Sequence, residues 1–240
     1  MMDDLKLLAG LPINISGIKI YPLKLVEIAE IGEVEFYTML GTLCFDIGDL
    51  ENYEQIKTEI ADLKPFDVIY NFCIYDINYS EKILNIFKLF LKQDVYIDKI
   101  NGVFYTRDKN IIDRNVFDEI IKVLKVQNHI QKSKEEEYNP ANSKAKEFIE
   151  KIKKIKKNAP KSKDNIDLHS IISGVTWKSG KNINEIWGLT IYQLFDAYRR
   201  LDIVDNYSNI MYGIYSGSID LKKINQKEIF WSVKFKNKED

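Results

Sequence analysis

The chain has 240 residues, of which 45% are hydrophobic and 30% are charged, and this composition is ordinary for a globular protein. Its length is sufficient for one sizeable hydrophobic core or two smaller ones. With 35 basic and 36 acidic side chains the formal net charge is −1, so no overall field attracts DNA, RNA or an anionic membrane, and only a local patch could do so.

Residues 1–130 predict an α+β domain that begins with a strand pair and a helix. INISGIKI (residues 13–20) alternates isoleucine with other residues around a Ser-Gly pair, which predicts two short strands and a glycine turn. Pro22 suits the first position of a helix, and apolar residues recur at helical spacing from there to Leu40. We expect Gly32 to end or kink this helix.

In the middle of this domain the sequence fits more than one secondary structure. NYEQIKTEIADL favours a helix that ends at Pro65, whereas FDVIYNFCIY (residues 66–75) is a short apolar run that fits either a strand or a helix. YSEKILNIFKLFLKQ has one apolar stripe at helical spacing, and Ser80 is the expected N-cap of that helix.

A β-hairpin and a helix are predicted to complete the domain. Asn101 and Gly102 separate VYIDKI from VFYTR, and this pair is typical of a two-residue type I′ turn, whose central residues both need a positive φ. DRNVFDEIIKVLKVQN then predicts an amphipathic helix capped by Asp113 or Asn115.

Residues 131–165 predict a charged helical linker between two folded parts. From Lys144 to Lys163 the chain has 9 lysines and 2 glutamates, a local charge of +7. Its large apolar residues fall at helical spacing: Phe148, Ile149, Ile152 and Ile155. Such a helix can be a solvated connector, can bind phosphates through its lysines, or can dock into an acidic groove of another protein.

Residues 166–240 predict an all-helical C-terminal domain. DLHSIISGVTW favours a short helix, and LTIYQLFDAYRRL (residues 189–201) a longer one in which Thr190 and Gln193 form a capping box. We expect this helix to end at Gly213 or Gly217. Its inward face is predicted to consist of Ile191, Leu194, Phe195, Tyr198 and Leu201. KEIFWSVKF, near the end of the chain, fits a last strand or a docking helix.

The sequence offers no recognisable catalytic site. A nucleophilic triad needs a base oriented by a third group, but neither His129 nor His169 lies in such a motif. Metal-ligand spacing and glycine-rich phosphate loops are likewise absent from the sequence, so we expect no enzyme activity, no metal and no cofactor. Cys44 and Cys73 are read as buried apolar residues of a protein in a reducing cytoplasm.

No stretch predicts export or membrane insertion. The N-terminal MMDDLKLLAG has acids where a signal peptide needs cations, and no window reaches the roughly 18 to 20 apolar residues that span a bilayer. We therefore expect function through binding another macromolecule. The residues predicted to do so are Phe148, Ile152, Ile155, Lys153, Lys156, Trp187, Tyr192, Arg199 and Arg200.

The segments IIDRNVFDEIIKVLKVQN, EYNPANSKAKEFIEKIKK and IWGLTIYQLFDAYRRLDIVDNYSNI resemble a recurrent protein of phages and phage-derived tail elements of low-GC Gram-positive bacteria. The resemblance extends from about Ile18 onward and is densest between Asp113 and Ile210. YSGSIDLKKIN departs from the pattern, where a small-residue turn and a basic, tryptophan-containing closing segment are expected. This departure leaves the end of the domain open.

The resemblance implies a role in virion morphogenesis, with no catalytic residue to carry over. The first hypothesis is a tail assembly chaperone that binds tape-measure or tail-tube protein in the host cytoplasm, with self-association as a further expectation. A structural virion component such as a baseplate or tail-end subunit is one alternative. A nucleic-acid-binding protein that uses the lysine-rich helix is another.

Overall fold

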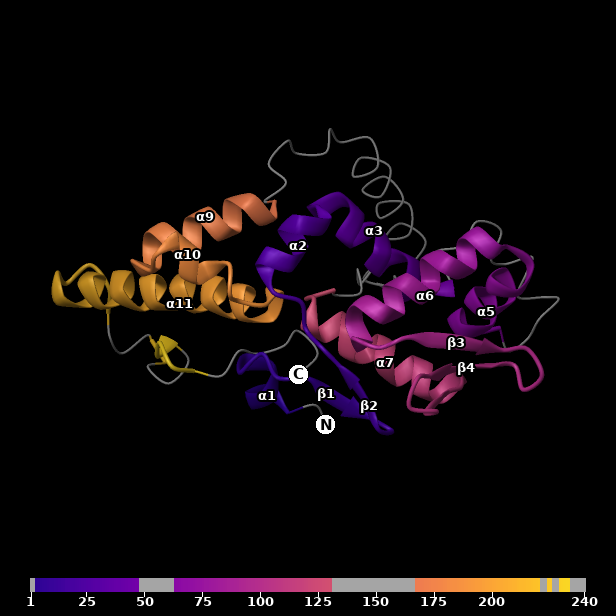
Figure 1. Ribbon diagram of the computed structural model, residues 1–240. Helices are drawn as coiled ribbons and strands as arrows, with labels where there is room; N and C mark the ends of the chain where they lie inside the picture. Colours follow the sequence, from indigo (N-terminus) through magenta and orange to yellow (C-terminus); the bar gives the residue numbers. More distant parts are fainter. Residues whose placement is uncertain (1–2, 48–62, 131–166, 221–223, 226–228, 234–240) are drawn as a thin grey trace, which may run out of the picture.

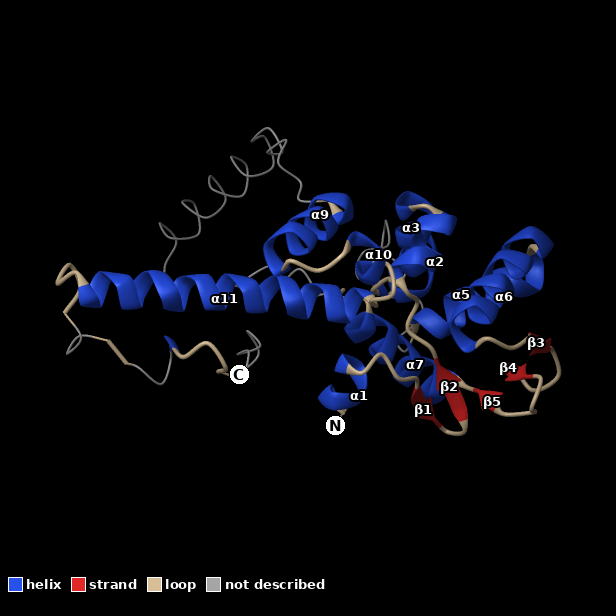
Figure 2. Ribbon diagram, turned by 60° about the vertical axis from the view of Figure 1, so that its left-hand side comes forward, coloured by secondary structure: helices blue, strands red, loops and turns tan. Residues whose placement is uncertain are grey.

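A computed structural model describes residues 3–47, 63–130, 167–220, 224–225 and 229–233, and these form an α+β fold that is mostly helical (Figures 1 and 2). The fold class predicted from the sequence is therefore confirmed. The linker expected at residues 131–165 lies outside the described residues, as does nearly all of the helix expected before Pro65.

The chain starts with α1 (Asp4–Leu8) and the hairpin of β1 (Ile13–Ile15) and β2 (Ile18–Ile20). The strands are antiparallel and are joined by the predicted Ser-Gly turn, because Ile15 pairs with Ile18 across it. Ser16 and Gly17 both have positive φ, 50° and 86°, which is the conformation that a two-residue turn of this type needs.

The predicted break at Gly32 is confirmed. This residue has a φ of 92° and separates α2 (Leu25–Ile31) from α3 (Glu33–Cys44). The prediction that Pro22 begins the first of these helices is wrong. Helix α2 starts three residues later, because the backbone N–H of Lys24 donates to a carboxylate oxygen of Glu27 over 2.8 Å and fixes the N-cap there.

The apolar run that fitted either a strand or a helix forms α5 (Pro65–Tyr75), which begins with its proline at the first position. Helix α6 (Ile77–Leu91) follows at once. The prediction of Ser80 as its N-cap is wrong, since Asp76 takes that place and accepts hydrogen bonds from the backbone N–H groups of Asn78 and Tyr79. Ser80 lies buried within the helix.

A three-stranded antiparallel sheet comes next, in the order β3 (Val95–Asp98), β4 (Val103–Thr106) and β5 (Ile111–Ile112). The predicted hairpin is confirmed, but its turn is not of type I′. Strand residue Asp98 pairs with Val103, so four residues, 99–102, connect the strands.

The acidic residue before this connection explains the longer turn. The carboxylate of Asp98 accepts from the backbone N–H groups of Ile100 and Asn101, at 3.0 and 3.1 Å, and thereby folds the loop back on itself. In this loop only Gly102 then needs a positive φ, which is 68°.

Helix α7 (Arg114–Gln127) completes the N-terminal part, and of the two predicted N-caps Asp113 takes the position. It packs against α3 and α5 and against strands β1, β2 and β5 (Figure 1). The centre of this core is a group of edge-to-face and tilted aromatic rings: Phe66, Phe87, Phe104 and Phe117.

The C-terminal part consists of α9 (Leu168–Ser179), α10 (Ile183–Ile186) and α11 (Ile191–Tyr215). The capping box of Thr190 and Gln193 is confirmed, and the helix ends just before Gly217, which has a φ of 75°. Of the predicted inward face, Tyr198 is wrong, because it is 40% exposed, whereas Phe195 and Leu201 pack against the core.

Of KEIFWSVKF the structure describes residues 229–233, in which Ile229 is helical and residues 230–233 form a turn beside α11, so the choice between a last strand and a docking helix stays a prediction. The guanidinium of Arg200 holds this turn by donating to the carbonyls of Trp231 and Val233, at 2.8 and 3.0 Å.

The two parts on either side of the expected linker touch directly and share one continuous group of buried apolar residues. The backbone N–H groups of Leu25 and Val26 donate to the carbonyls of Leu189 and Trp187, at 2.8 and 3.1 Å. A further link joins the side-chain amide of Gln193 to a carbonyl of α1. The domain limits at residues 130 and 166 stay a prediction, but the contact between the parts was not foreseen.

Gln193 is expected to stabilise the protein in two separable ways. Its amide oxygen accepts from the N–H of Thr190, and its amide nitrogen donates to the carbonyl of Leu8, both at 2.8 Å. Gln193→Ala removes both bonds and should lower the free energy of unfolding by about 1–2 kcal/mol in urea denaturation. Gln193→Glu keeps the cap but loses the donor, so it should lose about 1 kcal/mol; a Gln193→Glu protein as stable as the wild type would contradict a stabilising link to α1.

Candidate functional site

A groove of about 420 Å³ lies where α2 of the N-terminal part meets α9 and α10 of the C-terminal part. We call it the α2–α9 groove. Most of its lining is apolar, and the residues that define it are Leu25, Ile28, Leu168, Ile172, Trp177, Ile183 and Trp187. The groove exists only because the two parts pack together, since α2 supplies one wall and α9 and α10 the others.

The two ends of the groove differ in charge. At the end where α9 begins, a carboxylate oxygen of Glu33 accepts from the backbone N–H of Leu168 over 3.1 Å. At the end where α9 stops, Lys178 forms an ion pair with Asp205 of α11. Trp177 stands at this second end and is 85% exposed, although a side chain of this size is usually covered in a folded protein.

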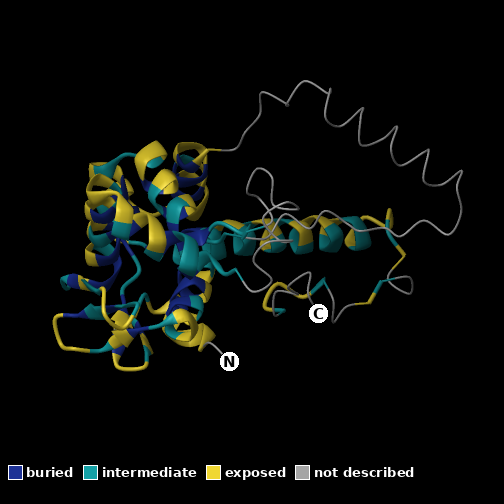
Figure 3. Cartoon of the chain, turned by 90° about the vertical axis from the view of Figure 1, so that its right-hand side faces the viewer, coloured by how far each residue is buried: buried dark blue, intermediate teal, exposed yellow. Residues whose placement is uncertain are grey.

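Helix α11 extends from the body of the protein as a long rod (Figure 3). Its 25 residues give it a length of about 37 Å at 1.5 Å per residue. Only Ile191 and Leu194, in its first turn, are buried. Near its far end Tyr212 and Tyr215 are 72% and 78% exposed, so this half of the helix presents aromatic surface to solvent.

The root of α11 rests on a histidine at the end of α7. The ring of His129 lies edge-on to Phe195, with centroids 4.8 Å apart, and stacked with Tyr192, at 6.4 Å. Burial, together with the nearby charge of Arg199, lowers the pKa of His129 to about 4. The imidazole is therefore neutral at physiological pH and serves as an aromatic packing element.

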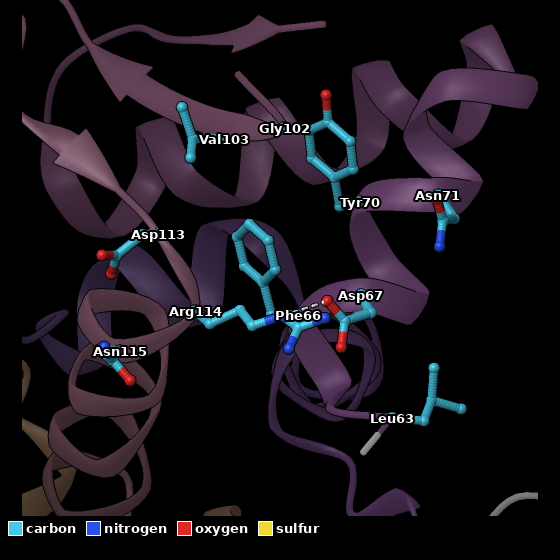
Figure 4. A pocket seen from close by; sticks show the side chains of 10 residues that line it. All are labelled: Leu63, Phe66, Asp67, Tyr70, Asn71, Gly102, Val103, Asp113, Arg114 and Asn115. Atoms are coloured by element: carbon cyan, nitrogen blue, oxygen red, sulfur yellow. Dashed lines mark hydrogen bonds and ion pairs between the residues drawn. The ribbon is translucent and has the colours of Figure 1, made fainter. Parts of the chain in front are cut away.

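A second hollow, of about 620 Å³, lies between α5, the hairpin and the start of α7 (Figure 4). An ion pair crosses its floor, with 2.7 Å between Nε of Arg114 and a carboxylate oxygen of Asp67. The other carboxylate oxygen of Asp67 accepts from the N–H of Lys64, so the ion pair also caps α5. The hydroxyl of Tyr70, on the wall, donates to the carbonyl of Asp98. These polar groups are engaged in holding the elements together.

The described residues contain no group of three His, Cys, Asp or Glu side chains placed to hold a metal ion. Among the same residues, no helix is long and apolar enough to cross a membrane. The thiols of Cys44 and Cys73 are unpaired and buried, and burial raises the pKa of each to about 12. At neutral pH these thiols are therefore protonated and poorly nucleophilic.

Of the residues predicted to bind a partner, the five in the linker, Phe148, Ile152, Ile155, Lys153 and Lys156, lie outside the described residues. The other four are in three different places. Trp187 lines the α2–α9 groove, Tyr192 and Arg199 lie beside His129, and Arg200 binds the C-terminal turn. The structure thus brings Tyr192 and Arg199 together but not the set as a whole.

Sequence reasoning did not single out Trp177, which is the most exposed large side chain of the groove region. Its exposure follows from its position on α9. The apolar residues Leu168, Ile171, Ile172 and Val175 define the buried face, and Trp177 falls on the opposite side of a helix of 3.6 residues per turn. The helical spacing of the apolar residues could therefore have indicated that Trp177 is exposed.

Comparison with known proteins gives one family match. Residues 157–236 match the YomV second domain, a phage-associated family, and this is about a third of the chain. No curated protein and no solved structure matches the sequence or the fold. The matched region includes α9, α10 and α11, so the groove walls from α9 and α10 and the whole rod lie in the part of the chain that is similar to a phage-associated domain, as fits a phage protein.

The half-buried His129 is expected to make the protein sensitive to acid. Its pKa is about 4 in the folded chain and near 6.5 when unfolded, so below pH 6.5 the unfolded chain binds the proton more readily. The free energy of unfolding should fall as the pH drops from 6.5 to 4, by less than about 1.4 kcal/mol per unit because solvent reaches part of the ring. Urea denaturation at a series of pH values measures this slope.

His129→Asn is the matched control for this pH dependence. His129 has a φ of 58°, and asparagine tolerates that left-handed conformation better than other non-glycine residues. The variant should be less stable at pH 7, because it loses the ring contacts, but should show a smaller slope between pH 6.5 and 4. An unchanged slope would assign the acid sensitivity to other groups.

Proposed function

We propose that the protein is a non-enzymatic phage tail morphogenesis protein, a tail assembly chaperone that binds tape-measure or tail-tube protein through the outer half of α11. The observation that carries this proposal is a row of exposed and half-exposed residues along the rod. We call this row the outer seam, and its members are Leu201, Val204, Ser208, Met211 and Tyr215.

The outer seam has the spacing of a coiled-coil surface. Its residues recur at steps of three, four, three and four, which is the pattern that keeps one stripe facing a partner helix. From Leu201 to Tyr215 it extends for about 21 Å, or two heptads. A partner rich in long helices offers the matching surface, and a tape-measure protein, as a long and coiled molecule, is the kind of partner expected.

The outer half of α11 carries an apolar residue beside the seam as well. Tyr207, one turn before Met211 on the helix, packs edge-to-face against Phe230 of the C-terminal turn, with ring centroids 5.9 Å apart. A helix with so wide an apolar stripe is normally covered along the whole stripe. The C-terminal turn covers Tyr207, whereas Tyr215 of the outer seam is 78% exposed, so we expect a binding partner to cover the seam.

The phage-associated domain match adds context, since it includes the whole of α11. It agrees with the sequence resemblance to phage tail proteins. It does not specify the partner, and the choice of tape-measure or tail-tube protein rests on the coiled-coil spacing of the seam and on that resemblance.

The proposal is tested by co-expression of the tagged chain with the tape-measure and tail-tube proteins of the same phage, followed by affinity purification. The wild type should retain one of them. The double variant Val204→Ser, Tyr215→Ser should retain at least about tenfold less, because it removes the apolar contacts of the seam. Both residues are exposed, so thermal unfolding should hardly change.

Tyr75→Ala is the matched control. Tyr75 is 88% exposed but lies at the end of α5, far from the rod, so this variant should retain the partner as the wild type does. Retention of neither phage protein by the wild type would overturn the proposal. Mass spectrometry of purified particles separates the two structural roles: a chaperone should be missing from them, whereas a baseplate or tail-end subunit should be present in a fixed number of copies.

A further inference from the structure

We propose that the α2–α9 groove is the interface of a two-fold homodimer, in which Trp177 of each copy enters the groove of the other. Trp177 lines one end of the groove, and its side chain is 85% exposed there. A surface that carries both a hollow and a projecting side chain is complementary to itself, and a two-fold axis lets each indole fill the facing hollow.

The direction of α9 sets how the two copies meet. Its residues along the groove extend from Leu168 to Trp177, a distance of about 14 Å. If the two α9 helices cross antiparallel, Trp177 of one copy lies over the Leu168 end of the other. Ser173, midway between His169 and Trp177, then faces its own counterpart, and its small side chain permits close approach of the helices.

The charges at the two ends of the groove favour this partner over a strongly acidic or basic one. Glu33 is at the Leu168 end, and Glu30 precedes it by three residues on α2. Lys181 follows α9 at the Trp177 end. An antiparallel two-fold arrangement places the lysine of each copy opposite the glutamates of the other, and so makes two attractive pairings. A partner of one charge sign would be repelled at one end.

The two exposed indoles supply a substantial part of the apolar surface that a dimer requires. A tryptophan buries about 150–250 Å², so the two indoles supply roughly 300–500 Å² of the 1,200–2,000 Å² typical of a specific interface. The groove walls add to this on each copy, together with Val26 and Ile183, which are 42% and 44% exposed.

Cysteine crosslinking tests the geometry directly. Ser173→Cys should form a disulfide-linked dimer on mild oxidation, or a dimer with a short bismaleimide, because the two introduced thiols face each other across the axis. Cys44 and Cys73 are buried and should not react. Ser216→Cys, at the far end of α11, is the control and should give only background crosslinking. Failure of Ser173→Cys to exceed this control would overturn the antiparallel arrangement.

Sedimentation velocity over a range of concentrations tests the contacts. The wild type should be a dimer at micromolar concentration, and Trp177→Ala should raise the dimer dissociation constant by about 30-fold or more, as expected for a central aromatic contact. Because Trp177 is exposed in the single chain, its removal should leave the thermal unfolding of the monomer unchanged. A wild type that stays monomeric, or a Trp177→Ala protein that dimerises like the wild type, would refute the proposal.

A charge exchange provides the final test. Lys181→Glu should weaken the dimer by placing like charges opposite each other, and so should Glu30→Lys, which is at an exposed position of α2. Combining the two substitutions should restore most of the affinity, which a general loss of folding cannot imitate. The seam variant Val204→Ser, Tyr215→Ser should dimerise normally, so the outcome is independent of the function proposed for α11.

Discussion

The structure depends on how the first turn of α2 is completed. The leading N–H groups of any helix have no acceptor within the helix itself. In this protein the N–H groups of Leu25 and Val26, the first two residues of α2, donate to the carbonyls of Leu189 and Trp187. Residues that are more than 160 positions later in the chain therefore act as the backbone acceptors of an early helix.

This arrangement fixes the root of α11. The two carbonyls belong to the short stretch that leads into the Thr190 N-cap, so the same residues complete α2 and begin α11. Gln193 adds a bond to α1, and Phe195 packs against His129 at the end of α7. The root of the rod is thus anchored at its first turns, α9 packs beside it and pairs with it through Lys178 and Asp205, and its far end extends away from the core (Figure 3).

The α2–α9 groove is a second consequence of the same contact. Docking of the C-terminal part against α2 brings Leu25 and Ile28 opposite Ile172 and Trp187, but it leaves the space between these walls unfilled. The rod and the groove are therefore separate surfaces that share one support. One presents a linear seam and the other a short hollow, and this suits the engagement of two different kinds of partner.

The sequence by itself determined the local features of this protein. It identified the α+β class, the Ser16-Gly17 turn, the break at Gly32 and the capping box of Thr190, because each depends on residues within a few positions of one another. It misplaced the N-caps near Pro22 and Ser80, because the side chains of Glu27 and Asp76 accept hydrogen bonds from the free backbone N–H groups at these helix starts. Only the tertiary structure decided which side chains are covered, which are exposed and where the groove forms. The groove, the exposure of Tyr198 and the packing of His129 arise from contacts between distant segments, and periodicity along one helix does not reveal which of its faces another element will cover.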